Sequence, residues 1–197
     1  MTIPSQVEKC LSQQGIAYQV VSGENVAPIY RLLSANEVNS GMIMTTVVLG
    51  DSLGRVQVLM PTDSLLNLTQ LCEQLGRNLQ ALPPDECLKL AQKHGSDRLL
   101  AVPYVYDLPI VADARLLESK KIYLEVSQSE LVVEMTQDEF KKSLTDADIG
   151  TFCVPLSRLK AEQKANDKAE LEQAVQQFTT LRIKQRLEQT LEMPPLP

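Results

Sequence analysis

Two β-branched, apolar runs separated by a short turn constrain this chain more than any other feature. The first run, residues 42–49, reads Met-Ile-Met-Thr-Thr-Val-Val-Leu, and the second, residues 55–60, alternates as Arg-Val-Gln-Val-Leu-Met. Between them, residues 51–54 read Asp-Ser-Leu-Gly, which are residue types that favour a chain reversal. The pattern predicts an antiparallel β-hairpin, so the chain is expected to build a sheet.

Helical periodicity surrounds this hairpin. Three segments repeat their apolar residues at helical spacing, and each ends at a glycine that can cap a helix: residues 5–14, 63–75 and 84–94. Thr136 and Glu139 form a capping-box pattern, which predicts a fourth helix through Leu144. Short strands are expected at residues 17–21, 29–33, 78–82, 99–102, 110–112, 122–125 and 131–134. The mixture predicts an α+β domain over residues 1–150.

The charge balance argues against a broad surface for nucleic acid. The 197 residues carry a net charge of -6, and residues 155–197 hold seven basic and six acidic side chains, which leaves 12 basic and 19 acidic ones in residues 1–154. Phosphate neutralisation needs clustered Lys and Arg. A local patch at Arg115, Lys120 and Lys121 is one candidate, and a solvated turn is the plainer interpretation.

Neither a metal site nor a membrane span is predicted. The cysteines, Cys10, Cys72, Cys87 and Cys153, form no Cys-x-x-Cys pair, and His94 is the single histidine. A nucleophilic Cys153 with His94 lacks a supporting motif, and His94 is expected to interact with a helix C-terminus. No apolar run has the roughly 18 to 20 residues that cross a bilayer, and the first residues lack signal-peptide order. A cytoplasmic protein without a cofactor is expected.

The order of the elements from Met42 to about Leu117 resembles the YbaK/ProX-like family, whose members hydrolyse wrongly charged aminoacyl-tRNA. The resemblance rests on the hairpin and on residues 101–113, Ala-Val-Pro-Tyr-Val-Tyr-Asp-Leu-Pro-Ile-Val-Ala-Asp. It covers about Ser5 to Leu144. It implies a mixed, mostly antiparallel sheet, curved and flanked by helices.

The resemblance also implies a site, and this chain departs from it. Family members carry a lysine on the first hairpin strand, where this sequence has Thr45. They carry a leading glycine in a turn that ends in proline, where this sequence has Leu99 or Leu100 before Pro103. Asp113 matches a family aspartate, although a cap or turn carboxylate is the plainer interpretation. No catalytic residue is therefore assigned.

The expected binding site is a pocket under the hairpin. The residues assigned to it are Thr45, Leu99, Ala101, Pro103, Tyr104 and Asp113. Tyr104 and Tyr106 flank the proline turn, where they either stack on a ligand or sit half-buried in the sheet. Asp107 either receives a ligand amine or serves the turn.

Residues 151–197 are expected to form a linker and an amphipathic helix. The helix is predicted over residues 167–192, with an apolar stripe that would form a dimer interface or pack on its own domain: Leu171, Val175, Phe178 and Leu181. The final Leu-Glu-Met-Pro-Pro-Leu-Pro resembles the start of HDOD signalling domains. This implies that a further domain follows.

Three functional interpretations follow. The first is a catalytically degenerate editing-type domain that binds a ligand, tRNA or protein partner inside a bacterial signalling protein. The second is an active trans-editing aminoacyl-tRNA deacylase that uses Lys120 or Arg115 as its cation. The third is a spacer dimerised through its C-terminal helix. The expected ligands are aminoacyl-tRNA or a small amino-acid-like molecule.

Overall fold

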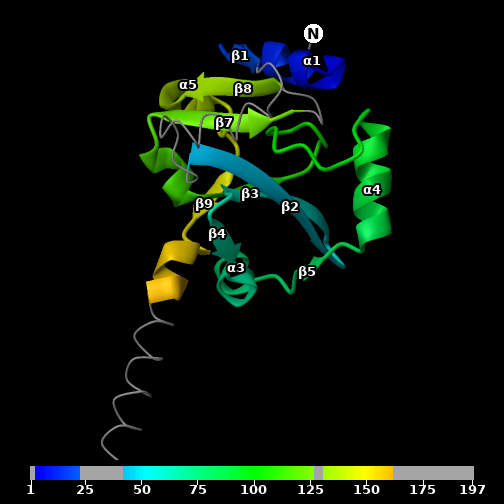
Figure 1. Ribbon diagram of the computed structural model, residues 1–197. Helices are drawn as coiled ribbons and strands as arrows, with labels where there is room; N and C mark the ends of the chain where they lie inside the picture. The colour runs from blue at the N-terminus through cyan, green and yellow to red at the C-terminus, as the bar shows by residue number, and fades with distance from the viewer. Residues whose placement is uncertain (1–2, 23–41, 127–130, 162–197) are drawn as a thin grey trace, which may run out of the picture. The chain divides into compact units, whose positions relative to one another are not determined.

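The computed structural model describes residues 3–22, 42–126 and 131–161 (Figure 1). The chain divides into two units, Met1–Pro155 and Leu156–Pro197. In the second unit, residues 156–161 are helical. The strand predicted at residues 29–33 and the helix predicted at residues 167–192, with its interface residues, lie outside the described residues.

The predicted hairpin is confirmed. Strand β2 (Ile43–Asp51) pairs antiparallel with β3 (Gly54–Pro61), with Val47 opposite Val58. The Asp51 carboxylate accepts the Leu53 N–H at 2.8 Å, and Gly54 adopts a φ of 126°, which only glycine takes without strain. The turn residues therefore form the reversal that their types indicated.

The hairpin lies at the centre of a mixed, mostly antiparallel, curved sheet. The strand order is β1-β8-β7-β2-β3-β6-β9, and β5 pairs with the far end of β2. The pairs β2–β7, β3–β6 and β6–β9 are parallel. The remaining bounds are β1 (Gln19–Ser22), β5 (Gln80–Ala81), β6 (Ile110–Asp113), β7 (Lys121–Glu125), β8 (Leu131–Thr136) and β9 (Asp148–Gly150). Short strands β4 (Ser64–Leu66) and β10 (Cys153–Pro155) form a separate pair.

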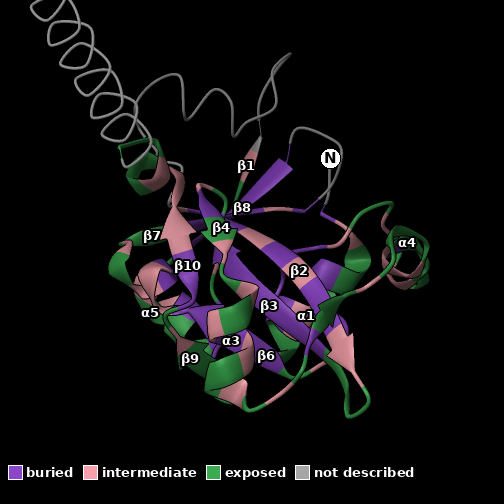
Figure 2. Ribbon diagram, turned by 90° about the horizontal axis from the view of Figure 1, so that it is seen from below, coloured by how far each residue is buried: buried purple, intermediate pink, exposed green. Residues whose placement is uncertain are grey.

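Alternating side chains divide the core between the two faces of this sheet. One face carries Leu59 and Ala112, and helices α1 (Ser5–Gln13) and α5 (Gln137–Lys142) pack there; we call it the α1-side core. The other face carries Val58 and Val111 against helix α3 (Leu68–Leu75) and is called the α3-side core. Figure 2 shows buried residues along β3 and β6, with exposed residues on the outer surface of α3.

The helix ends follow local sequence signals. Helix α4 (Pro84–Lys93) begins at a proline, and Gly95, just past its end, has a φ of 74°. The predicted cap of α5 is present, because Thr136 Oγ1 accepts the Glu139 N–H at 3.4 Å. The Glu139 carboxylate accepts the N–H of Ala17 at 2.8 Å instead of completing the box, so it ties α5 to the approach to β1.

The helix predicted over residues 63–75 begins later than expected. Residues 64–66 form β4, which pairs with β10 about 90 positions further on, and the Asn67 side chain then caps α3 by accepting the Gln70 N–H at 3.1 Å. Pairing with the distant strand β10 therefore outweighs the local helix propensity at Ser64. Hydrophobic periodicity describes neighbouring residues only, so it does not predict this pairing.

The strand predicted at residues 99–102 is wrong. Leu100 and Val102 are fully buried, but their segment pairs with no strand. Their carbonyls accept hydrogen bonds from Gln57 Nε2 on β3, at 3.3 and 3.1 Å. The Gln57 amide thus satisfies backbone carbonyls that a neighbouring strand would otherwise bond. The segment is therefore a buried loop, and its apolar composition resembles that of a strand. Within the described ranges, no helix is long and apolar enough to cross a membrane.

Candidate functional site

The structure divides the predicted site residues between the two faces of the sheet. Met44 belongs to the α1-side core, so its neighbour Thr45 faces the opposite way, where Thr45 pairs with Met60 of the α3-side core. Asp113 shares this face, because it follows Ala112, which pairs with Leu59 and belongs to the α1-side core. Ala101 and Leu99 pack with the α1-side core, in the loop that carries Pro103 and Tyr104. The predicted residues thus form two groups.

Asp113 holds the protein's own backbone together. Its side chain is fully buried, Oδ1 accepts the Arg115 N–H at 3.0 Å, and Oδ2 accepts the N–H groups of Phe152 and Cys153 at 3.0 and 2.9 Å. The first bond caps the short 3-10 helix η2 (Ala114–Glu118), which is the cap role that the sequence left open. The other two fix the start of β10. All three donors are backbone N–H groups of this protein, so the carboxylate is engaged in holding the fold.

A hydrogen bond within the loop that contains the proline turn stabilises this loop. The Leu100 N–H donates to the Tyr106 hydroxyl at 2.5 Å, and the Tyr106 ring packs edge-to-face on His94 with centroids 5.0 Å apart. Burial raises the pKa of Tyr106 to about 12, so the phenol stays neutral. His94 lies at the C-terminus of α4 as expected, where it is the C-cap residue and its backbone N–H donates to the Ala91 carbonyl at 2.9 Å; its ring packs on Tyr106.

The carbonyl of Pro103 turns toward α1. It accepts hydrogen bonds from Cys10 Sγ at 3.1 Å and from Gln14 Nε2 at 3.3 Å. Burial raises the pKa of the Cys10 thiol, so the thiol remains a donor and not a thiolate nucleophile. The turn is therefore joined to the first helix through two side chains that sequence reasoning had not connected with it.

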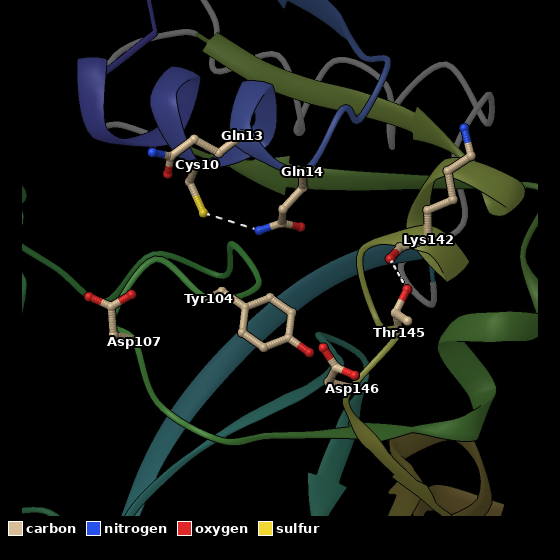
Figure 3. Close-up of a pocket in the computed structure, with 8 residues that line it drawn as sticks. All are labelled: Cys10, Gln13, Gln14, Tyr104, Asp107, Lys142, Thr145 and Asp146. Carbon is tan, nitrogen blue, oxygen red and sulfur yellow. Dashed lines mark hydrogen bonds between the residues drawn. The ribbon is translucent and has the colours of Figure 1, made fainter.

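A cavity of about 440 Å³ opens beside this turn (Figure 3). We call it the Tyr104 cavity. Its walls come from α1, from the loop after Pro103 and from the segment that follows α5; the lining residues are Cys10, Gln13, Gln14, Tyr104, Asp107, Lys142, Thr145 and Asp146. In Figure 3 the Tyr104 ring lies between Asp107 and Asp146, and its hydroxyl points toward Asp146. Burial raises the pKa of this phenol, while the Asp146 backbone N–H acts in the opposite direction.

Of the residues assigned to the site from sequence, the cavity includes Tyr104, and it also includes Asp107, which sequence reasoning had considered for a ligand amine. The α1 residues and the segment 142–146 were missed. No signal in the sequence pointed to them, because they lie about 90 and 40 positions from the loop and meet it only through the packing of α1 and α5. Tyr104 sits in a loop and not in the sheet, with a φ of 61°.

Arg115, one of the two cations proposed for an enzyme beside Lys120, is engaged elsewhere, and so are two further lysines, Lys121 and Lys142. Arg115 contacts Ser64 Oγ and lies 3.6 Å from the Asp63 carboxylate. Lys121 pairs with Glu134 at 2.6 Å. Lys142 lines the Tyr104 cavity, but its ammonium bonds Glu139 at 2.6 Å and points away from the Tyr104 ring in Figure 3.

The cysteine interpretation finds no support in the geometry. Cys153 is buried in the α3-side core, whereas His94 packs on Tyr106, which belongs to the α1-side core. Burial, followed by the nearby Asp113 carboxylate, raises the pKa of the Cys153 thiol well above its usual range. Within the part of the chain that the structure describes, no three His, Cys, Asp or Glu side chains are grouped to hold a metal ion.

Comparisons with known proteins agree with this architecture. The family model of the aminoacyl-tRNA editing domain matches residues 23–143. The crystal structure of a candidate signal transduction protein from Marinobacter aquaeolei VT8 is 29% identical, with a TM-score of 0.71 over 100% of this chain and 41% of that chain. This chain therefore spans about two fifths of that protein. No curated protein matches the chain.

Two further crystal structures share the fold. A candidate trans-editing enzyme for prolyl-tRNA synthetase is 20% identical, with a TM-score of 0.62 over 76% of this chain and 95% of that chain. A hypothetical protein is also 20% identical, with a TM-score of 0.62 over 76% of this chain and 99% of that chain. Because the family model spans more than half of the sequence, and the sheet has the expected architecture, this chain belongs to the aminoacyl-tRNA editing domain family.

Proposed function

We propose that this protein is a non-catalytic member of the editing domain family, which binds a small ligand in the Tyr104 cavity and serves as a regulatory module. The observation that carries this proposal is the state of Asp113. Its carboxylate is fully buried and accepts three backbone N–H groups, so it holds β10 and η2 in place. A carboxylate committed in this way is poorly placed to act on a substrate.

The proline turn supports the same conclusion. In the family that this chain resembles, the turn that ends in proline is expected to present backbone N–H groups to the aminoacyl carbonyl, because preorganised donors stabilise developing negative charge. Here the N–H of Leu100 donates to the Tyr106 hydroxyl at 2.5 Å. Thr45, where the family has its lysine, brings no positive charge and faces the other side of the sheet.

The pairing of surface cations argues in the same direction. Binding to the phosphates of tRNA requires Lys and Arg side chains that are available to exchange counterions. Many of the described cations lie within 4.0 Å of a carboxylate: Arg55, Arg77, Lys89, Arg98, Arg115, Lys121 and Lys142. This supports a small ligand over a polyanion.

The match to the Marinobacter protein supports a regulatory setting. That protein is described as taking part in signal transduction, and the match covers 41% of its length. We infer that this chain is a comparable module of a cytoplasmic protein and that it is joined to a further signalling domain. The HDOD resemblance at residues 191–197 stays a prediction.

The enzyme alternative has one specific requirement. A deacylase without the hairpin lysine needs another cation near Thr45 and Asp113, and Arg115 is the candidate on that side. Its guanidinium is held by Ser64 and Asp63. The alternative thus requires Arg115 to leave both partners when substrate binds.

A deacylation assay separates the two. The chain would be incubated with a panel of mischarged tRNAs that includes Ala-tRNA(Pro) and Cys-tRNA(Pro), beside buffer and an active trans-editing enzyme. We expect ester loss at the buffer rate, and hydrolysis well above it would refute the proposal. A Thr45→Lys variant runs in parallel, and hydrolysis in this variant alone would assign the loss of chemistry to this one position.

A further inference from the structure

We propose that residues 145–155, which we call the strap, open and close as one unit and link the Tyr104 cavity to the C-terminal unit, with Asp113 as the group that holds the strap closed. The inference rests on the binding role proposed above and adds the route by which a bound ligand acts on the rest of the chain. It follows from the two ends of the strap, from its contacts with the sheet and from the position of Asp113.

The strap begins at the cavity and ends at the boundary between the two units. Its first residues, Thr145 and Asp146, line the Tyr104 cavity, and the Tyr104 hydroxyl points toward Asp146 in Figure 3. Its last residue, Pro155, is bonded directly to Leu156, where the second unit begins. A short segment therefore connects the wall of the proposed binding site with the start of the next part of the chain.

The middle of the strap lies at the surface. Strand β9 is the last strand in the order of the main sheet and, among the described residues, it pairs only with β6. Asp148, Ile149 and Thr151 are exposed, and the Thr151 carbonyl accepts a hydrogen bond from Gln74 Nε2 at 3.2 Å. Edge segments with little buried surface open at a lower free energy than the core. We therefore expect the strap to open before the central hairpin.

The end of the strap is buried, and Asp113 holds it there. Phe152 and Cys153 belong to the α3-side core, and their N–H groups both donate to Asp113 Oδ2, at 3.0 and 2.9 Å. The Phe152 carbonyl accepts the Asn67 N–H at 2.8 Å, and β10 then pairs with β4. Because an unpaired buried donor is costly, the closed strap depends on this one carboxylate.

Gly150 shows how closely the closed strap fits against α3. A Cβ at this position would lie 2.5 Å from Gln74 Oε1 and 3.2 Å from Phe152 Cδ1. A methyl group here displaces the Gln74 amide and presses on the Phe152 ring. Because packed interiors do not deform continuously, such a group favours the open strap over a slightly displaced one. This contact is a second way to open the strap while the Asp113 carboxylate is intact.

Amide hydrogen exchange of the full chain, followed residue by residue by NMR, tests the proposal. Asp113→Asn removes the charge and keeps the side-chain shape, and Gly150→Ala opens the strap through the second contact. Asp148→Asn is the matched control, because it makes the same chemical change within the strap at an exposed position. The cavity end is reported by Ala147, whose N–H donates to the Leu144 carbonyl at 3.0 Å.

We expect Asp113→Asn and Gly150→Ala each to speed exchange by about tenfold or more at Ala147, in β9 and in β4. The amides of β2 and β3 should keep the rates of the unaltered protein, and Asp148→Asn should change no rate. Because the link requires the whole strap to respond, the effect at Ala147 decides it.

Three results overturn the proposal. Faster exchange confined to Phe152 and Cys153, whose acceptor is altered in Asp113→Asn, would mean that the cavity end is not linked to the far end. Equal acceleration in the hairpin would mean that the strap is no separate unit. Unchanged rates in both variants would mean that neither contact holds the strap. With deacylation still at the buffer rate, each of these results leaves the non-catalytic function standing.

Discussion

Four aspartates in this molecule have the same chemistry and two different settings. On the α3 side, Asp113 accepts three backbone N–H groups, and Asp51 accepts both Nε and Nη2 of Arg77, at 2.9 and 2.5 Å. On the α1 side, Asp107 and Asp146 line a cavity, and no described residue pairs with them. The difference shows which carboxylates this fold uses for its own stability and which it leaves exposed without a partner among the described residues.

Removal of the Asp113 carboxylate gives the largest expected effect. In Asp113→Ala three backbone N–H groups lose their acceptor, two of them from buried residues, so we expect the free energy of unfolding to fall by about 4 kcal/mol. Urea denaturation followed by circular dichroism measures it. Asp148→Ala, at an exposed position on β9, is the control and should change stability by less than about 0.5 kcal/mol. A loss below about 1 kcal/mol for Asp113→Ala would mean that water replaces the carboxylate.

Gln57 tests how the α1 side holds its loop. Gln57→Leu keeps the volume but removes the donors to the carbonyls of Leu100 and Val102, so we expect a loss of about 2 kcal/mol. Hydrogen exchange should show faster opening of residues 99–107 than of the hairpin. If the whole domain loses protection uniformly, the loop is not an independent unit and the contrast between the two sides weakens.

The Asp51–Arg77 pair predicts a pH dependence. The hydrogen bond from Arg77 lowers the pKa of Asp51 from 3.8 to about 2. Because the folded-state pKa is depressed, this stabilisation is present above about pH 4 and is lost as the pH falls toward 2. Thermal melts between pH 2 and 5 should show a shallower decline for Arg77→Met than for the unaltered protein. Parallel declines would assign acid sensitivity to other carboxylates.

Asp107 gives the smallest effect, with the opposite sign. Asp107→Gly relieves the positive φ of 52°, and we expect the free energy of unfolding to rise by about 0.5 kcal/mol. Asp97→Gly gives no such relief and should lower stability slightly. A clear fall in stability for Asp107→Gly would show that its carboxylate serves the loop, as the turn interpretation holds.

The helices and the hairpin were predictable because their signals are local. Glycines ended the helices at residues 15, 76 and 95, and the turn at residues 51–54 set the hairpin register. The loop at 99–102 was not predictable, because apolar residues there are buried by a loop as well as by a strand. Only the amide of Gln57, more than 40 positions away, distinguishes the two.

The sequence by itself determined that the chain forms a hairpin-centred α+β domain of the editing family and that the hairpin lysine is replaced by Thr45. The tertiary structure decided where polar groups go. It placed Thr45 and Asp113 on one face of the sheet and the Pro103 turn on the other, and it brought Gln14 and Asp146 to Tyr104. Side-chain direction in a strand and contacts across many positions depend on pairing and packing, which local patterns do not encode.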